Sequence, residues 1–270
     1  MLFNTNPQLL RNFIENQRRI LEARTNRKIY IYGSGRQGWG ALSSFLNGFD
    51  DKITRAISKQ AHECWVILIL LELLLDKGDF FTEDYVFVQP ARGAPYQNDG
   101  RILLKEHTVW IEPWLPPYNK KKILQKYGSK LRFLINTGET IHTTPDALLI
   151  SGRFPSLPFP AFALHAFIEF EDIGEQKLLE FEQKVKPNIK WLIECKDQIP
   201  THRDLAQFLF YVLAYKVPSL LILQTPLPQK TFYNDVKLLR NLGFTVEVIE
   251  NFKVGQRNLC LRNLKVFVDC

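Results

Sequence analysis

The stretch KWLIECKDQ, residues 190–198, ends an apolar run with a glutamate and a lysine. Residues 191–193 predict a buried β-strand, and Glu194 and Lys196 follow two positions apart. Successive side chains of a strand point to opposite faces of the sheet, so these two charged residues share one face and Cys195 takes the other. Glu-x-Lys is common elsewhere in the chain, but the other copies lie in polar helices or loops, and only this one ends an apolar strand.

A carboxylate beside a lysine at the end of a strand suits metal-assisted hydrolysis of a phosphodiester. The carboxylate of Glu194 can help to hold Mg²⁺, which prefers oxygen ligands. The ammonium group of Lys196 can orient or deprotonate the attacking water and offset the charge that grows on the phosphate. A second carboxylate is expected on a neighbouring strand. Asp146 is the candidate, because the single Pro-Asp pair of the chain stands at the head of the apolar run ALLI.

The rest of the chain alternates between helical and strand patterns. Helical spacing of apolar residues is expected over about 7–24, 53–76, 174–186, 203–215 and 229–242. Strand-like runs occupy 84–90, 102–114, 131–136, 146–151, 190–197, 219–225 and 245–250. This alternation predicts an α/β protein.

Composition excludes several classes of protein. The chain has 270 residues, of which 46% are hydrophobic, so a sizeable core is expected. No stretch reaches the roughly 18–20 apolar residues of a membrane span, and the longest candidate, residues 65–75, contains Glu72. The first residues lack the apolar core of a signal peptide, so a cytoplasmic location is expected. The four cysteines form no C-x-x-C pair, which argues against a zinc site and a disulfide framework.

Positive charge is concentrated near the N-terminus. The net charge is +7, and residues 1–60 hold ten Lys or Arg against four Asp or Glu. A second basic run, residues 119–133, holds six basic residues in fifteen. A basic segment on a nearly neutral body predicts a polyanionic partner, and the alternative is a surface that only promotes solubility.

TTPDALLI and WLIECKD together resemble the motif of the PD-(D/E)XK nuclease superfamily. The resemblance implies a restriction-endonuclease-like core, a central mixed β-sheet flanked by helices, and a Mg²⁺-dependent DNA endonuclease, with Mn²⁺ as the other candidate metal. It implies that Asp146 and Glu194 bind the metal near the scissile phosphate and that Lys196 positions the water. The backbone carbonyl of Cys195 would complete the metal shell. The substrate would be duplex or branched DNA.

Two further segments are similar to elements of this family. AHEC lies in the helix before the first core strand, where the resemblance implies another acidic ligand, and here that residue is Glu63. AQFLFY resembles the Q-x-x-x-Y element of RecB-like nucleases, which would place Gln207 at the site with Tyr211 one helical turn later. From the residues alone, Glu63 could equally lie on the solvated side of its helix, Gln207 could be an ordinary polar helix residue, and Tyr211 fits a core position.

The resemblance divides the chain into a basic N-terminal extension, residues 1–52, and a nuclease-like domain, residues 53–270. Asp146 and Glu194 have 47 residues between them, more than the hairpin usual in the family. Residues 152–188 are therefore expected to be an insertion, which could serve as a substrate-contacting arm or as the interface of a homodimer.

Two other functions compete with the nuclease. One is a non-catalytic nucleic-acid-binding or assembly protein on the same fold, because a fold does not guarantee an activity. The other is a dinucleotide-binding enzyme, since Gly33, Gly35 and Gly38 spell G-x-G-x-x-G after a strand-like run. The helical pattern that follows argues against it, because a Rossmann unit needs a second strand there. The same loop could instead present Arg36, Gln37 and Trp39 to a substrate.

Overall fold

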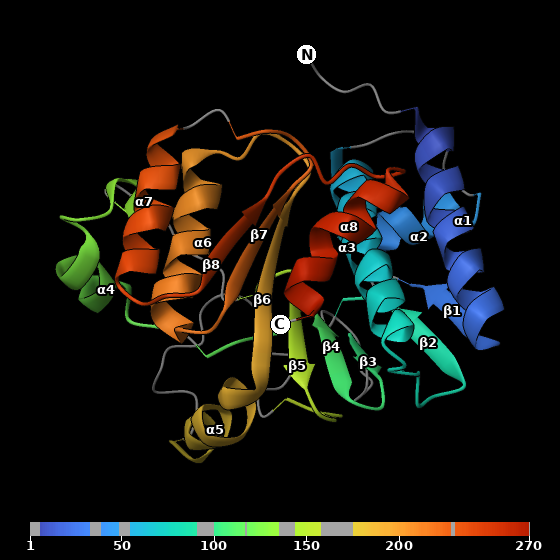
Figure 1. Ribbon diagram of the computed structural model, residues 1–270, viewed down its shortest axis with the longest axis horizontal. Coiled ribbons are helices and arrows are strands. Elements are labelled where there is room, and N and C mark those ends of the chain that lie inside the picture. Colours follow the sequence, from blue (N-terminus) through green and yellow to red (C-terminus); the bar gives the residue numbers. More distant parts are fainter. Residues whose placement is uncertain are drawn as a thin grey trace.

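A mixed six-stranded sheet, in the order β3-β4-β5-β6-β7-β8, forms the centre of the molecule (Figure 1). The computed structural model describes residues 6–32, 39–48, 55–90, 100–116, 118–134, 144–157, 175–227 and 230–269. The strands of the sheet are β3 (Arg101–Leu103), β4 (His107–Ile111), β5 (Ala147–Ser151), β6 (Ile189–Lys196), β7 (Ser219–Leu223) and β8 (Val246–Ile249). The predicted α/β class with a mixed sheet is confirmed.

The sheet changes direction at β6. Strands β3 to β6 pair antiparallel, and β6, β7 and β8 pair parallel. The parallel half follows from the connections, because α6 (His202–Tyr215) and α7 (Lys230–Asn241) carry the chain back between successive strands. β6 is therefore hydrogen-bonded on both edges, and its continuous apolar run reflects the burial of both of its faces.

Helices cover both faces of the sheet. Figure 1 shows α6 and α7 on one side, and α3 (Arg55–Asp76) and α8 (Arg257–Val268) on the other. The side chains of β6 divide between the two layers as their alternation requires. Trp191, Ile193 and Cys195 lie in the core that includes α3 and α8 residues, whereas Leu192 lies in the core that includes Tyr211 of α6.

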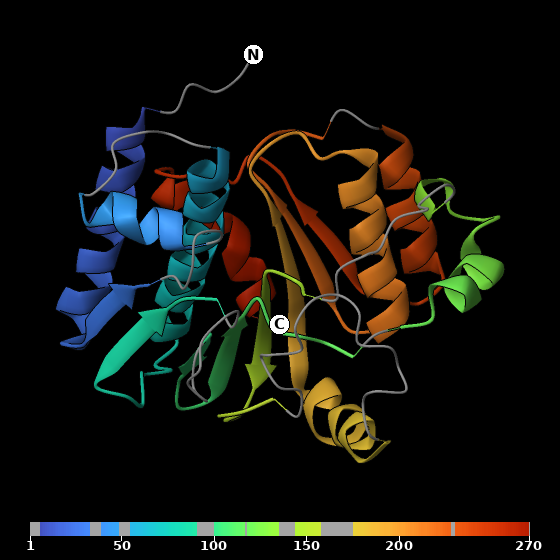
Figure 2. The ribbon, with the colours of Figure 1, turned by 180° about the vertical axis from the view of Figure 1, so that it is seen from behind.

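The N-terminal segment packs on the outer side of α3. It contains α1 (Pro7–Thr25), β1 (Lys28–Ile31) and α2 (Gly40–Leu46), and β1 pairs in parallel with β2 (Tyr85–Val88). Figure 2, which shows the molecule from behind, places α1 and α2 beside α3. At the opposite side of the molecule, α4 (Lys120–Tyr127) lies outside α6 and α7. Apolar residues of α1 share one core with α3. The division at residues 52 and 53 stays a prediction.

The segment between β5 and β6 is helical where the structure describes it. α5 (Glu175–Glu180) continues into η3 (Phe181–Val185), a π-helical turn, and η4 (Lys186–Asn188), a 3-10 turn, and confirms the helix predicted over 174–186. Phe181 and Val185 are buried and pack against the α6 side of the sheet. Residues 158–174 of the expected insertion lie outside the described residues.

Three local predictions are wrong. The single strand-like run expected over 102–114 is a hairpin of β3 and β4, because the exposed Lys105 and Glu106 form a turn between them. The strand expected over 131–136 is a 3-10 turn, η1 (Arg132–Leu134), and residues 135 and 136 lie outside the described part of the chain. Leu131 and Phe133 bury themselves among α6 and α7 residues, and the Phe133 N–H donates to Asp235, so this segment satisfies its apolar pattern without pairing in a sheet.

Trp39 cannot face a substrate as the loop hypothesis required, since its side chain is 1% exposed and packs in the core with α3. Gly33, Gly35, Arg36, Gln37 and Gly38 lie outside the described residues. None of the helices in the described ranges has the length and apolar character that crossing a membrane requires.

Candidate active site

The register of β5 and β6 brings the predicted acidic residues together. Ala147 pairs with Ile193 in the antiparallel ladder, so Asp146, just before β5, lies next to the end of β6. The backbone N–H of Cys195 donates to Asp146 Oδ2 at 2.6 Å. The two strands pair although 47 residues separate Asp146 from Glu194.

Glu194 and Lys196 form an ion pair on the α6 side of β6. Their Oε1 and Nζ atoms are 2.6 Å apart, and Glu194 is 1% exposed. The other oxygen of Glu194, Oε2, is buried and accepts no hydrogen bond from the described residues. Lys196 Nζ also lies 3.8 Å from Asp204, whose carboxylate accepts from Thr201 in the capping box of α6. The capping box therefore helps to place the lysine.

Two further carboxylates approach Asp146 from other elements. Glu63 comes from α3 and is 3% exposed, which settles that it faces inward and not toward solvent. Glu112 follows β4 directly. Carboxylate oxygens of Glu63, Glu112 and Asp146 all lie within 4.8 Å of one another. The structure therefore places these three acidic residues at the same end of the sheet as Glu194.

Glu112 was missed by the sequence reasoning. Its backbone N–H donates to the carbonyl of Asp146 at 2.9 Å, which extends the β4–β5 ladder by one residue. Its φ of 44° is in the left-handed region, which is uncommon for a residue with a Cβ. Such strained positions cluster at functional sites. A signal was present in IEPW, residues 111–114, where an acidic residue ends the apolar strand as Glu194 does.

Burial and mutual repulsion change how the acidic groups titrate. Burial raises the pKa of Glu63 well above its usual range, and the charge of Asp146 raises it further. Burial and the same neighbour raise the pKa of Glu194 to about 7. Both shifts mean that these carboxyls hold protons more tightly than they would in water.

Two lysines oppose this repulsion. Lys59, one helical turn before Glu63, lies 3.2 Å from its Oε1, and Glu63 and Asp146 raise the pKa of Lys59. Burial alone would lower the pKa of Lys196, but Glu194 and Asp146 outweigh it and raise the pKa overall. Lys196 is therefore an ammonium group at neutral pH. Its positive charge partly offsets the negative charges of Glu194 and Asp146.

The donor set fits a hard divalent cation. Mg²⁺ and Mn²⁺ favour carboxylate and carbonyl oxygens, and the group offers carboxylates from Asp146, Glu63 and Glu112. Glu194 is not among these three carboxylates, and its buried Oε2 accepts no hydrogen bond from the described residues. The carbonyl of Cys195 points to the same strand edge as its N–H, which donates to Asp146, since both groups of a strand residue face one neighbour.

Gln207 and Tyr211 lie one helical turn apart on α6. Gln207 is half-buried and its Nε2 donates to the Tyr211 hydroxyl at 2.7 Å. Burial raises the pKa of Tyr211, and the charge of Glu194 raises it further. Tyr211 is fully buried and belongs to the core, as its position in the sequence suggested.

Two other side chains near the acids have core roles. His62 is buried beside Glu63, its Nε2 lies 3.1 Å from the Phe252 carbonyl, and burial lowers its pKa to about 4, so it is neutral. Burial raises the pKa of the Cys195 thiol, which is therefore protonated. Neither side chain belongs to the group formed by Glu63, Glu112 and Asp146.

Comparisons of the chain with protein-family models, with curated proteins and with solved structures found no match.

Proposed function

We propose that this protein is a metal-dependent DNA endonuclease on a restriction-endonuclease-like core. The observation that carries the proposal is the convergence of Asp146, Glu63 and Glu112 with the Glu194–Lys196 pair at one end of the sheet. The order of elements also agrees with the resemblance: α3 brings Glu63, β5 follows Asp146, β6 ends in Glu-x-Lys, and α6 leads to β7.

The side chains suggest a division of roles. Asp146, Glu63 and Glu112 would hold Mg²⁺, with Glu194 Oε2 and the Cys195 carbonyl beside them. When bound, the metal would polarise the scissile phosphate and lower the pKa of a bound water. Lys196 stays protonated beside Glu194, so it would orient the water and offset charge on the phosphate, and would not act as a base.

One observation favours the non-catalytic alternative. Lys59 and Lys196 already form ion pairs with Glu63 and Glu194. Buried carboxylates paired in this way can be part of a fold without any metal, in a protein that only binds nucleic acid. The two functions differ in whether DNA is cut.

The test is incubation of the full chain with supercoiled plasmid, linear duplex and four-way branched DNA, in EDTA, Mg²⁺ or Mn²⁺. The nuclease proposal expects cleavage of at least one substrate that requires a divalent metal and is lost in Asp146→Asn and Glu112→Gln. Glu106→Gln is the control, because Glu106 is an exposed carboxylate in the turn between β3 and β4. DNA binding without cleavage under every condition would support the non-catalytic function instead.

A further inference from the structure

A pocket of about 520 Å³ lies at the end of the parallel strands opposite to the acidic residues. Pro218 and Thr245 line it, and they stand just before β7 and β8, whereas Glu194 lies near the end of β6. Because these three strands are parallel, their starting and finishing ends are on opposite edges of the sheet. The pocket is therefore separate from the candidate active site.

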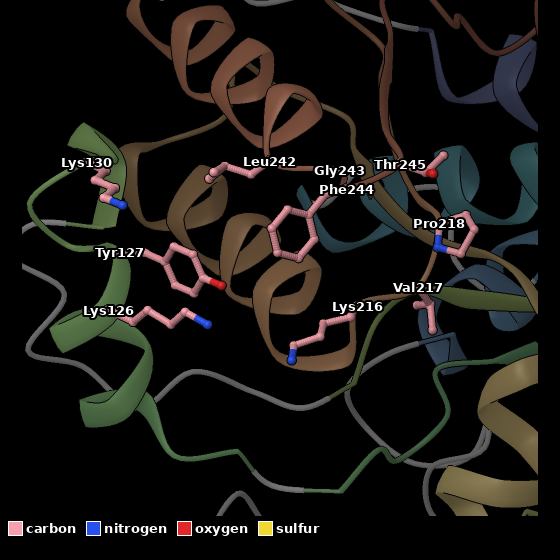
Figure 3. A pocket seen from close by; sticks show the side chains of 10 residues that line it. All are labelled: Lys126, Tyr127, Lys130, Lys216, Val217, Pro218, Leu242, Gly243, Phe244 and Thr245. Atoms are coloured by element: carbon pink, nitrogen blue, oxygen red, sulfur yellow. The ribbon is translucent and has the colours of Figure 1, made fainter.

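Three lysines give the pocket a positive charge. Figure 3 shows Lys126 and Lys130 reaching in from the α4 side and Lys216 from the end of α6. None of the lining residues is acidic, and no carboxylate of the described residues forms an ion pair with these lysines. The nearby Arg240, in contrast, lies 2.6 Å from Glu247. Clustered cations without carboxylate partners favour binding of an anion.

Lys216 occupies a position that usually takes another residue. It caps the C-terminus of α6 with φ 54° and ψ 39°, the left-handed conformation. Glycine or asparagine is usual there, because a Cβ is unfavourable in that region. The lysine stabilises the negative end of the helix dipole, but the strained backbone also places an ammonium group at the mouth of the pocket (Figure 3).

Two aromatic rings lie between the lysines. Tyr127 and Phe244 pack edge to face with centroids 6.3 Å apart, and both are half-buried. Leu242 adds an exposed apolar surface to the same wall. Partly exposed rings beside cations are the combination that binds the base and the phosphate of a nucleotide. The volume is in the range of about 300–1,000 Å³ typical of small-molecule sites.

We propose that this pocket binds a nucleoside phosphate, with the phosphate on Lys126, Lys130 and Lys216 and the base against Tyr127 and Phe244. The phosphate could belong to a free nucleotide or to the 5′ end of a nucleic-acid strand. The proposal does not rest on the nuclease function, because none of these residues belongs to the acidic site. It gives a role to Lys126 and Lys130, two of the six basic residues in the second basic run, residues 119–133.

The test is isothermal titration of the full chain in EDTA, where no metal-dependent cleavage can occur. The probes are AMP, the four deoxynucleoside 5′-monophosphates, a 5′-phosphorylated hexanucleotide, adenosine and inorganic phosphate. A nucleotide or the hexanucleotide should bind roughly tenfold more tightly than adenosine or phosphate, because it engages rings and lysines together. Binding by mononucleotides identifies a free nucleotide as the ligand, and binding by the hexanucleotide alone identifies a strand end.

Lys216→Gly is the decisive variant, since glycine suits the left-handed backbone and its melting temperature should not fall. It should weaken binding roughly tenfold, as should Phe244→Leu. The control is Lys237→Ala, which removes an exposed lysine of α7 outside the pocket. Equal affinities of wild type and Lys216→Gly, or no binding of any nucleotide or of the hexanucleotide, would overturn the proposal. A Phe244→Leu variant that fails to fold would leave the Lys216→Gly result to decide.

Discussion

Lys196 and Glu194 depend on each other at the residue scale. A buried ammonium and a buried carboxylate are each costly alone, and the 2.6 Å contact compensates both. The contact leaves one oxygen of Glu194 without a hydrogen bond from the described residues. The proposed function would give that oxygen a metal to bind.

Lys196→Ala is expected to abolish metal-dependent DNA cleavage and to leave DNA binding nearly unchanged. Loss of an electrostatic group at a reacting phosphate typically lowers the rate by about 10²–10³-fold. Cleavage rates and binding isotherms in Ca²⁺ would be compared with those of Lys190→Ala, an exposed lysine on the same strand. A Lys196→Ala enzyme that cuts at the wild-type rate would show that the role given to the lysine is wrong.

The raised pKa of Glu194 predicts how stability depends on pH without metal. Between its ordinary value of 4.5 and about 7, the folded carboxyl holds a proton that the unfolded one has lost. Stability must therefore fall as pH rises through this window, by on the order of 3 kcal/mol for this one group. Glu194→Gln should flatten that part of the profile, measured by urea unfolding in EDTA from pH 4.5 to 8. The exposed Glu175→Gln serves as the control, and a Glu194→Gln profile that overlays the wild type would refute the shift.

At the scale of elements, one buried glutamate joins three helices. Glu72 of α3 is 1% exposed and forms ion pairs with Arg24 of α1 and Arg257 of α8. Gln17 of α1 donates to the same carboxylate at 2.6 Å. Glu72, the buried carboxylate of the apolar helix α3, thus links α1 and α8 to α3.

Removing one partner of that glutamate should destabilise the whole fold. Arg257→Ala is expected to lower the free energy of unfolding by about 3 kcal/mol, because a buried carboxylate loses much of its compensation. The double variant Glu72→Gln/Arg257→Ala should lose less, since no buried charge is stranded. Arg262→Ala, an exposed arginine of the same helix, should be neutral in the same urea titrations. Equal costs for Arg257→Ala and Arg262→Ala would mean that the ion pair contributes nothing.

The basic N-terminal segment is less available to DNA than its charge suggests. Arg18 pairs with Glu15, Arg24 with Glu72 and Asp76, and Arg27 with Asp84. The partners of Arg24 and Arg27 could not be foreseen because they lie far along the chain, whereas the three-residue spacing of Glu15 and Arg18 is visible in the sequence. Binding of DNA by this segment stays a prediction.

Arg19 provides the cleanest test of that prediction, because it is exposed and forms no ion pair with the described residues. If it contacts a phosphate, Arg19→Ala should reduce the slope of log affinity against log salt by about 0.9. Sequence preference should survive, since phosphate contacts carry no base information. A salt series of binding isotherms measures the slope. Equal slopes for wild type and Arg19→Ala would show that Arg19 does not contact DNA.

For the whole molecule, a bound metal should stabilise the fold. Mg²⁺ or Mn²⁺ would relieve the repulsion among Glu63, Glu112 and Asp146, and a ligand at a hundred times its Kd contributes about 2.7 kcal/mol. The gain in melting temperature should be larger at pH 8 than at pH 6, because Glu63 and Glu194 must release protons to the solvent first. Asp146→Asn should abolish the gain and Glu175→Gln should keep it. A metal response that survives Asp146→Asn would place the cation elsewhere.

Much of the sheet and its acidic end could be predicted from local pattern alone. The apolar runs at β5, β6 and β7 and the helical spacing at α3 and α6 set the elements, because alternation and helical periodicity are properties of neighbouring residues. Glu194 and Lys196 share a face for the same reason. Asp146 was expected near them because TTPDALLI and WLIECKD together resemble one family motif, and not because of local pattern.

Only the tertiary structure decided the rest. Whether Glu63 faces solvent or the site, whether Glu112 joins it, and whether β5 pairs with β6 all depend on contacts between residues far apart in the sequence. The same is true of α8, which the sequence reading did not anticipate, and of the arginines of α1. A periodic pattern states that a face must be buried, but not against which partner, because burial is non-directional and any complementary apolar surface satisfies it.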